Sequence, residues 1–229
     1  MRKILYLGLE ISKRWLEENQ DAEIFHSPII EINNRSLDDP TIVTSFSQFY
    51  KYTHILLTSK VAVRLFFTAL SHFGLAREEL VNKNIIVVGK GTEEAVIQRG
   101  AVVYKCATEE SSEGIVKLLK PLNLAGAHFL WPCSALSRKI IPNFLKENEI
   151  PFCQMFLYNT LTTPCKTTLH KELPSADELV FTSPSTVDAF LETFETIPWH
   201  KKITAIGPIT HSRLQKAKEE QLSCLPILL

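Results

Sequence analysis

An internal repeat is the feature of this 229-residue chain that most constrains its fold. Residues 55–67 and 179–191 each contain an apolar run, then Thr-Ser, then apolar residues at helical spacing. Residues 85–96 and 203–214 each contain an apolar run, then Gly-x-x-Thr, then a second helical pattern. Each block therefore predicts a strand, a sharp turn and a helix. Alternating units of this kind form parallel sheets with helices on both faces.

A third pair of blocks extends the repeat to the whole chain. Residues 3–32 and 129–161 each start with a strand and a helix and continue into a long extended segment. The first half adds one more predicted helix, residues 112–120, which is introduced by the acidic sequence Glu109-Glu-Ser-Ser-Glu-Gly. Two copies of one plan predict two small, flavodoxin-like α/β domains with parallel sheets. The two extended segments, 24–33 and 152–162, are then expected to join the domains as a two-stranded β connector.

The turns that follow the predicted strands are candidates for ligand binding. In open parallel sheets, ligands bind outside the carboxyl ends of the strands. Most of these turns are small, hydroxylated or glycine-containing and open a helix, so their main-chain N–H groups and the positive end of the helix dipole favour anions. The candidate anion-binding residues are Ser59, Lys60, Gly89, Lys90, Thr92, Ser183, Ser185, Gly207 and Thr210.

Ordinary structural roles also account for these residues. Ser59, Ser183, Thr92 and Thr210 are predicted N-caps, where the side-chain oxygen accepts a hydrogen bond from an early helix N–H. Capping alone would explain the hydroxyl groups, and a solvated surface would explain the two lysines. The pattern therefore leaves both a structural and a ligand-binding interpretation open.

Charge and composition argue against several classes of function. The chain has 25 Lys and Arg residues and 25 Asp and Glu residues, so it lacks the basic surplus typical of proteins that bind nucleic acid or an anionic membrane. Its longest apolar runs are far too short to cross a bilayer, and Glu10 and Lys13 interrupt the N-terminal apolar segment, so no signal peptide is expected. The five scattered cysteines, without CxxC spacing, predict free thiols in a reducing cytosol.

Three single residues are further candidates. Tyr158 lies on the second connector segment, where it would either line a cleft between domains or belong to a core. Cys133 follows a strand, but no histidine is placed to activate it as a nucleophile. His211 is expected on the surface of a helix. The sequence contains no P-loop, dinucleotide fingerprint or constellation of metal ligands, so we expect no metal.

The order of these motifs resembles that of the uroporphyrinogen-III synthase family across nearly the whole chain. The resemblance is carried by the Thr-Ser and Gly-x-x-Thr turns, by Ser-Glu-Gly from Ser112, by Trp-Pro-Cys-Ser-Ala-Leu-Ser-Arg-Lys-Ile-Ile-Pro from Trp131 and by Tyr-Asn-Thr from Tyr158. Phe-Thr-Ser-Pro-Ser from Phe181 and Ala-Ile-Gly-Pro-Ile-Thr from Ala205 complete the order.

This resemblance implies a cytoplasmic lyase of tetrapyrrole (haem) biosynthesis that uses no cofactor. The implied substrate is hydroxymethylbilane, a linear tetrapyrrole with acidic side chains on every ring. The family closes the macrocycle with inversion of ring D and loss of water, which gives uroporphyrinogen III. This small-molecule substrate is the expected partner of a monomeric protein, and a transient contact with the preceding pathway enzyme is compatible with it. Neither nucleic acid nor a membrane is an expected partner.

The resemblance also implies an arrangement of domains and site. One α/β domain would comprise residues 1–24 and 166–229 and the other residues 37–151, with connector strands at 25–36 and 152–165 and the active site in the cleft. Tyr158 matches the family tyrosine that helps the hydroxyl group leave. The matches to family positions that hold substrate carboxylates or supply a cation are Ser59, Lys60, Thr92, Arg138, Ser183, Ser185 and Thr210.

Two other functions stay open on the sequence alone. A non-catalytic, two-lobed module that binds a small anion would need the same turns. A flavodoxin-like electron carrier would need a hydroxyl-rich phosphate loop after its first strand. The chain has Gly8-Leu-Glu-Ile at that position, which argues against a flavin.

Overall fold

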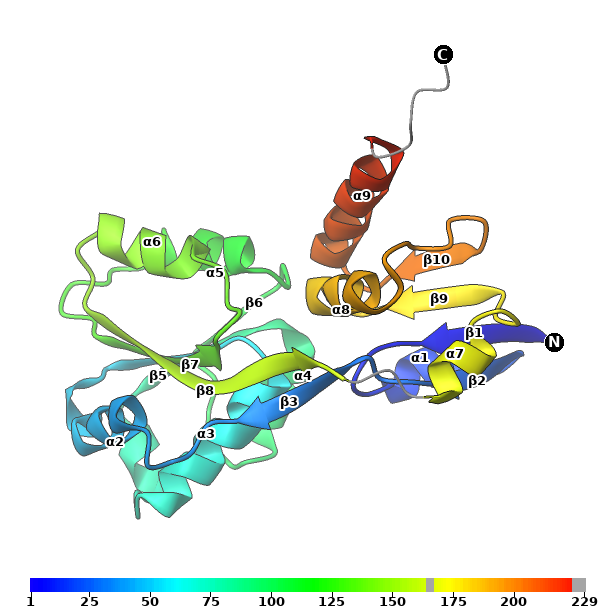
Figure 1. Ribbon diagram of the computed structural model, residues 1–229. Coiled ribbons are helices and arrows are strands. Elements are labelled where there is room, and N and C mark those ends of the chain that lie inside the picture. The colour runs from blue at the N-terminus through cyan, green and yellow to red at the C-terminus, as the bar shows by residue number, and fades with distance from the viewer. Residues whose placement is uncertain (164–166, 224–229) are drawn as a thin grey trace. The chain divides into compact units, whose positions relative to one another are not determined.

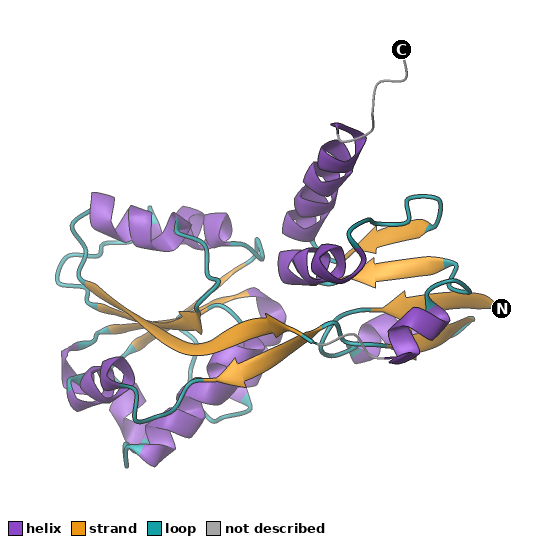
Figure 2. Ribbon diagram, viewed as in Figure 1, coloured by secondary structure: helices purple, strands orange, loops and turns teal. Residues whose placement is uncertain are grey.

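The computed structural model describes residues 1–163 and 167–223, so two of the five cysteines, Cys165 and Cys224, lie outside the described residues. The chain forms two compact units: unit 1 comprises Met1–Ile32 and Thr160–Leu229, and unit 2 comprises Asn33–Asn159. Each unit is built on its own sheet with helices on both faces (Figure 1, Figure 2). The predicted α/β class with parallel sheets is therefore confirmed.

Unit 1 contains a four-stranded sheet in the order β10-β9-β1-β2, in which every neighbouring pair is parallel. Alternate side chains of β1 point to opposite faces, so Leu5 belongs to a core shared with α8 and α9, whereas Ile4 and Tyr6 pack with Trp15 of α1. The strands are β1 (Arg2–Tyr6), β2 (Ala22–His26), β9 (Glu178–Phe181) and β10 (Lys202–Ala205). The helices are α1 (Lys13–Glu18), α7 (Thr167–Glu172), α8 (Pro184–Phe194) and α9 (Pro208–Ser223).

Unit 2 is built on a six-stranded sheet in the order β3-β8-β7-β4-β5-β6. The chain passes from one unit to the other within β3 and within β8, which are neighbours in this sheet. The strands are β3 (Ile30–Asn34), β4 (His54–Leu57), β5 (Asn84–Val88), β6 (Lys105–Ala107), β7 (Phe129–Ser134) and β8 (Phe152–Thr162). The helices are α2 (Pro40–Ser47), α3 (Lys60–His72), α4 (Gly89–Ile97), α5 (Ser112–Leu119) and α6 (Ile140–Glu147), with 3-10 turns at Phe49–Lys51 and Arg77–Leu80.

Both faces of the unit 2 sheet are covered. Leu56 and Ile86 share a core with residues of α5 and α6. Ile55 and Leu57 point to the opposite face and are also fully buried. Helices α5 and α6 lie over one face, and α2, α3 and α4 lie over the other (Figure 1). Burial on both faces explains why these strands are continuous apolar runs in the sequence.

The predicted order of elements is largely confirmed, with one correction. Residues 24–33 are not one extended segment, because β2 ends at His26 and β3 begins at Ile30. The main-chain N–H groups of Ser27 and Ile29 bond to the end of β1 and the residue after it, and Pro28 between them has no N–H to continue a ladder. The prediction also missed the helices α2 and α7 and the three-residue strand β6.

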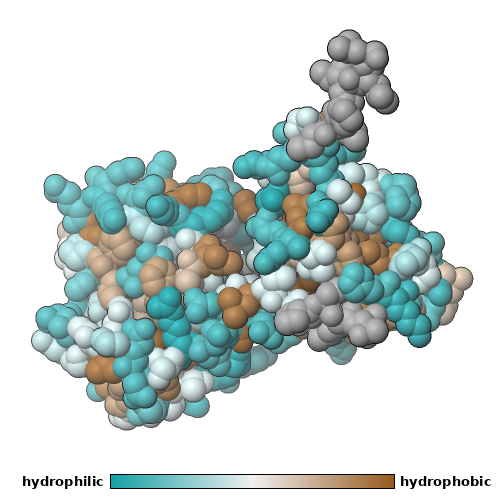
Figure 3. Space-filling model, viewed as in Figure 1, coloured by the Kyte–Doolittle hydropathy of each residue, from teal (hydrophilic) through white to brown (hydrophobic). Residues whose placement is uncertain are grey.

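The surface mixes hydrophilic residues with scattered hydrophobic ones on the face shown in Figure 3. Large exposed apolar side chains occur singly along the chain, among them Tyr50, Val81, Val102 and Leu136. Scattered exposure of this kind is normal for folded proteins. Within residues 1–163 and 167–223, none of the helices combines the length and the apolar character that crossing a membrane requires.

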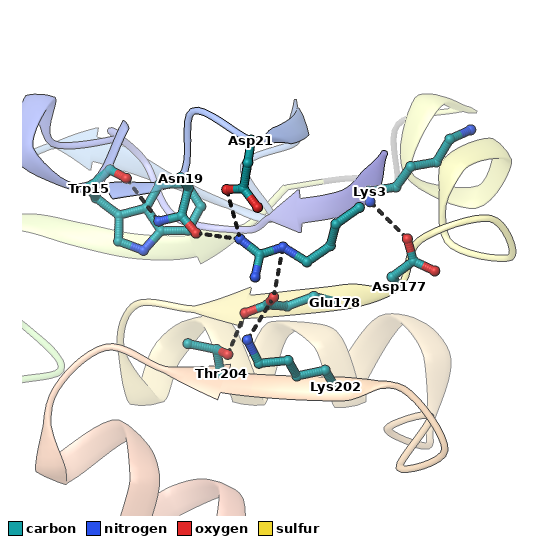
Figure 4. Close-up of polar contacts among 9 residues, drawn as sticks. Lys3, Trp15, Asn19, Asp21, Asp177, Glu178, Lys202 and Thr204 are labelled. Atoms are coloured by element: carbon teal, nitrogen blue, oxygen red, sulfur yellow. Dashed lines mark hydrogen bonds and ion pairs between the residues drawn. The ribbon is translucent and has the colours of Figure 1, made fainter. Parts of the chain in front are cut away.

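A buried carboxylate links three neighbouring strands of unit 1 (Figure 4). The Glu178 side chain, on β9, is 4% exposed. It accepts hydrogen bonds from Lys202 Nζ at 3.0 Å and from Thr204 Oγ1 at 2.5 Å, both on β10. Arg2 Nε, on β1, lies 3.9 Å from the same carboxylate. Because a buried charge is tolerated only when it is paired, these contacts stabilise the order of β1, β9 and β10.

Lys202→Met is expected to lower the free energy of unfolding by about 2 kcal/mol. Removing one partner of a fully buried ion pair costs about 3–5 kcal/mol. The loss is smaller here because the Lys202 side chain is 61% exposed and because Thr204 and Arg2 remain beside the carboxylate. Urea denaturation of the full chain, followed by circular dichroism, measures the change.

Lys216→Met is the matched control, because Lys216 forms an exposed pair with Glu220 and its loss should change stability by less than about 0.5 kcal/mol. Adding Glu178→Leu to the Lys202→Met variant should recover most of the loss, because the buried carboxylate is then absent. Equal stabilities of the Lys202→Met and Lys216→Met variants would contradict this account of the buried carboxylate.

Candidate active site

The carboxyl edge of the unit 2 sheet gathers most of the predicted site residues. The strand order places the residues after β4 and β5 at neighbouring positions of this edge, between the ends of β7 and β6. Ser59 follows β4, Gly89 follows β5, and Tyr158 lies on β8 opposite Ser134, the last residue of β7. Residues far apart in the sequence therefore meet at one edge.

Tyr158 and Ser59 form the central contact of this edge. The phenol oxygen and Ser59 Oγ are 3.1 Å apart, and either can be the donor. Ser59 Oγ also accepts from the Ala62 N–H at 3.0 Å as the N-cap of α3, as predicted. The cap fixes the hydroxyl group, and the hydroxyl group in turn orients Tyr158.

A β-bulge sets the direction of the Tyr158 side chain. Cys133 pairs with Phe156, but the next residue, Ser134, pairs with Tyr158, so Leu157 is an extra residue on β8. Leu157 and Tyr158 are both buried, with 2% and 7% of their surface exposed, as expected in a sheet that is covered on both faces. Bulges redirect side chains and are common beside active sites.

The Tyr158 phenol is a proton donor at neutral pH. Burial raises the pKa of Tyr158 above its ordinary value, and the hydrogen bond with Ser59 offsets this only in part. The group therefore keeps its proton well into the alkaline range. A protonated, oriented phenol can donate a hydrogen bond to an oxygen atom that is leaving a substrate.

The turn after β5 differs from the prediction. Helix α4 starts at Gly89 itself, which has a φ of 72°, and no side chain caps it. Thr92 is therefore not the N-cap but a buried residue in the first turn, 6% exposed. Glycine reaches this φ without strain, so the chain enters the helix directly from the strand. The main-chain N–H groups at the start of α4, rather than the Thr92 hydroxyl, are the groups available to an anion.

The predicted cations have different surroundings. Lys60 and Lys90 are exposed. The Lys60 side chain extends over Gly91, where an added Cβ would lie 2.7 Å from Lys60 Cε and 3.3 Å from Nζ, so its charge lies beside the start of α4. Arg138 instead donates two hydrogen bonds of 2.6 Å to the Glu113 carboxylate. Its guanidinium is already engaged by a carboxylate of the same unit.

The carboxyl edge of the unit 1 sheet carries the remaining predicted residues. Ser183 is the N-cap of α8, as predicted, in a capping box with Thr186. Its Oγ lies 2.8 Å from Ser185 Oγ. Gly207, with a φ of 86°, and Pro208 form the turn that opens α9. The prediction that Thr210 is an N-cap is wrong, because Thr210 is the third residue of α9 and is only 2% exposed.

The structure disfavours two alternative catalytic groups. Cys133 is 1% exposed, and burial raises the pKa of its thiol to about 11, so it is not a reactive thiolate. His211 lies exposed on α9, as predicted. In the part of the chain that the structure describes, no three His, Cys, Asp or Glu side chains lie close enough together to hold a metal ion.

Sequence reasoning missed two acidic residues at the unit 2 edge. Glu113 holds Arg138, and the Glu110 carboxyl group lies against Gly89, where the Cδ of Glu110 would be 2.6 Å from an added Cβ. The only available signal was the acidic sequence before the predicted helix at residues 112–120. The contacts of these two glutamates with Arg138 and Gly89 depend on the order of the strands in the sheet, which local sequence patterns do not predict.

Comparisons with known proteins agree with the family resemblance. Residues 12–223 match the family model described as uroporphyrinogen-III synthase HemD. The porphyrin biosynthesis protein HemD of Ruminiclostridium josui is 32% identical over 164 residues, which are 68% of this chain and 31% of that protein. The chain thus spans about a third of the length of the curated relative it matches.

Solved structures show the same fold. A mutant uroporphyrinogen III synthase of Thermus thermophilus has a TM-score of 0.64 at 15% identity, and the match covers 97% of this chain and 100% of that one. The uroporphyrinogen-III synthetase of Helicobacter pylori has a TM-score of 0.60 at 19% identity, and the match covers 96% of this chain and 90% of that one. The match to the family model covers nearly the whole chain and confirms the resemblance: the chain belongs to the uroporphyrinogen-III synthase family.

Proposed function

We propose that this protein is a uroporphyrinogen-III synthase, a lyase that closes hydroxymethylbilane with inversion of ring D and loss of water. Membership of the family supports the proposal. The structural observation that carries it is the buried Tyr158 phenol, 3.1 Å from Ser59 Oγ at the carboxyl edge of a parallel sheet. This group is suited to assist a leaving hydroxyl group.

The chemistry requires no nucleophile from the protein. The lone pair of the pyrrole nitrogen expels hydroxide from the terminal CH₂OH group and leaves an electrophilic azafulvene cation. The substituted carbon of ring D then attacks the methylene carbon of this cation on ring A and forms a spiro intermediate. This intermediate breaks the bond to the original bridge carbon and recloses with ring D inverted, and loss of a proton restores the pyrrole, so that the net loss is one water. The protein must assist the departing hydroxide and hold the two ends of the chain together, so positioning supplies much of the acceleration. We assign the acid role to Tyr158, whose pKa is raised by burial.

Substrate carboxylates are assigned to the turns that open helices. The substrate is polyanionic while the protein has no net charge, so binding must come from local groups. The main-chain N–H groups at the starts of α3, α4, α8 and α9 supply them in our proposal, and the charge of Lys60 adds to the field at α4. The Thr92 and Thr210 hydroxyls are buried, so main-chain groups rather than these side chains act at their turns.

The cellular setting follows from the proposed reaction. A soluble biosynthetic substrate and free thiols fit the cytoplasm, where we place the protein as a monomer without a cofactor. Hydroxymethylbilane is unstable in water, so a transient contact with the enzyme that makes it would protect it. That contact is part of the proposal and rests on the chemistry of the substrate.

Turnover of freshly prepared hydroxymethylbilane tests the proposal. The purified full chain should consume it much faster than a protein-free solution does. The rival function, a two-lobed module that only binds small anions, predicts consumption at the protein-free rate together with measurable anion binding by calorimetry. Those two results together would contradict the proposed enzyme function and favour the binding module.

A further inference from the structure

We propose that Glu110 and Glu113 act as internal stand-ins for substrate carboxylates at the edge of unit 2, and that the substrate must displace both. These residues belong to the acidic segment, defined as residues 109–113, which follows β6 and includes the first two residues of α5. The inference rests on the proposed function, because it concerns the start of α4, to which that function assigns a substrate carboxylate, and Arg138, which matches a cationic position of the family.

The pair of Glu113 and Arg138 is the first of the two contacts that the substrate would displace. Arg138 Nη1 and Nη2 donate to the two carboxylate oxygens of Glu113, each at 2.6 Å. This two-point contact is the common geometry of arginine–carboxylate pairs, whether the carboxylate belongs to the protein or to a ligand. The hydrogen bonds from Arg138 lower the pKa of the Glu113 carboxyl group, so it is ionised at neutral pH.

This ion pair is easily exchanged. The side chains of Arg138 and Glu113 are 39% and 45% exposed, so water and salt screen the attraction between them. An exposed pair of this kind adds little to stability. A substrate carboxylate can therefore replace Glu113 on Arg138 at small cost.

The contact between Glu110 and Gly89 is the second that the substrate would displace. The Glu110 carboxyl group lies against Gly89, the first residue of α4, at the position that a glycine side chain leaves empty. The early N–H groups of a helix have no partner within the helix and favour a negative charge. Burial, followed by the charges of Glu93 and Glu110, raises the pKa of the Cys106 thiol near this turn, which is consistent with a negative field there.

The acidic segment is held in place rather than free to move. Ser111 Oγ accepts from the Gly114 N–H at 2.9 Å as the N-cap of α5 and donates to the Glu109 carboxylate at 3.0 Å. Ser111 is 6% exposed, and the Glu109 carbonyl packs directly on Gly114. The fixed backbone holds Glu110 against Gly89 and Glu113 against Arg138.

The acidic segment selects for ligands with several carboxylates. A ligand with one carboxylate can replace only one of the two glutamates, and the other still repels it. A ligand that carries acidic groups on every ring can replace both at once. The acidic segment thus lowers affinity for all anions but lowers it least for a polycarboxylate of the right spacing.

Kinetics of the Glu110→Gln/Glu113→Gln double variant test the proposal in the full chain. We expect KM for hydroxymethylbilane to fall about fivefold, from the removal of two weak competing contacts, with kcat changed less than about twofold. Glu94→Gln/Glu147→Gln is the matched control, because it removes two exposed glutamates on α4 and α6 and changes net charge equally. Its KM should match that of the wild type.

Three outcomes separate this proposal from the proposed function. An unchanged or higher KM in the double variant, or an equal fall in the control, overturns the stand-in role while the enzyme function stands. If the wild-type protein does not turn over hydroxymethylbilane, the proposed function fails. Calorimetry with benzene-1,2,4,5-tetracarboxylate then decides the stand-in role: tighter binding by the double variant than by the control supports it, and equal binding overturns it.

Discussion

Tyr158→Phe is expected to lower the rate of uroporphyrinogen III formation about a hundredfold without changing the fold, as loss of a general acid typically does. The variant keeps the buried ring and removes only the hydroxyl group that lies 3.1 Å from Ser59 Oγ. Without that donor, hydroxide must leave unassisted from the substrate. The measurement is the initial rate of formation of the type III isomer, after oxidation and chromatographic separation of the products.

Tyr52→Phe is the control for this variant. Tyr52 is another buried tyrosine of unit 2, 5% exposed, but it precedes β4 and so lies at the opposite end of that strand from Ser59. Its loss should change the rate less than about twofold. A wild-type rate in the Tyr158→Phe variant would contradict the role of Tyr158 as an acid. Ser59→Ala completes a double-mutant cycle, in which a non-additive effect with Tyr158→Phe identifies Ser59 as the residue that positions the phenol.

Gly114→Ala and Gly91→Ala are expected to change stability in opposite directions. At Gly114 in α5, an added Cβ would collide with the Glu109 carbonyl oxygen and lie 2.9 Å from its carbon, so backbone must move and the free energy of unfolding should fall by about 3 kcal/mol. At Gly91 in α4, the nearest atom is the mobile Cε of Lys60, at 2.7 Å. Because Ala favours a helix more than Gly, stability should rise there by about 0.5 kcal/mol.

Urea denaturation of the two variants, followed by circular dichroism, checks both signs. The comparison controls for helix propensity, because both changes replace glycine by alanine near the start of a helix in unit 2. Equal stabilities would show that the acidic segment does not pack tightly on Gly114. A destabilised Gly91→Ala variant would show that Lys60 cannot move aside.

The parts of the fold that depend on local pattern were predictable from the sequence. Ser59 and Ser183 each cap a helix directly after a buried strand, as the repeated Thr-Ser turn indicates. The Gly-x-x-Thr turn was misread at both copies. Its threonine resembles an N-cap, but the glycines at 89 and 207 have positive φ, and the helix starts at or just after the glycine.

The contacts that make the site were not predictable from the sequence. Ser59 and Tyr158 are 99 residues apart in the sequence. They meet because β4 and β8 are the two neighbours of β7 in the sheet and because a bulge at Leu157 redirects the tyrosine side chain. The pair of Arg138 and Glu113 likewise depends on the packing of α5 against α6. The local periodicity of apolar residues indicates where strands and helices lie in the sequence, but it does not indicate the order of the strands in the sheet.

The isomer composition of the product tests the central claim most directly. Hydroxymethylbilane is incubated with the wild-type protein and, in parallel, without protein, and the oxidised porphyrins are separated into types I and III. The proposed function predicts mainly type III with the protein, and type I, from closure without inversion of ring D, in its absence. A product of type I alone with the correctly folded protein would contradict the assignment of this chain as the enzyme that inverts ring D.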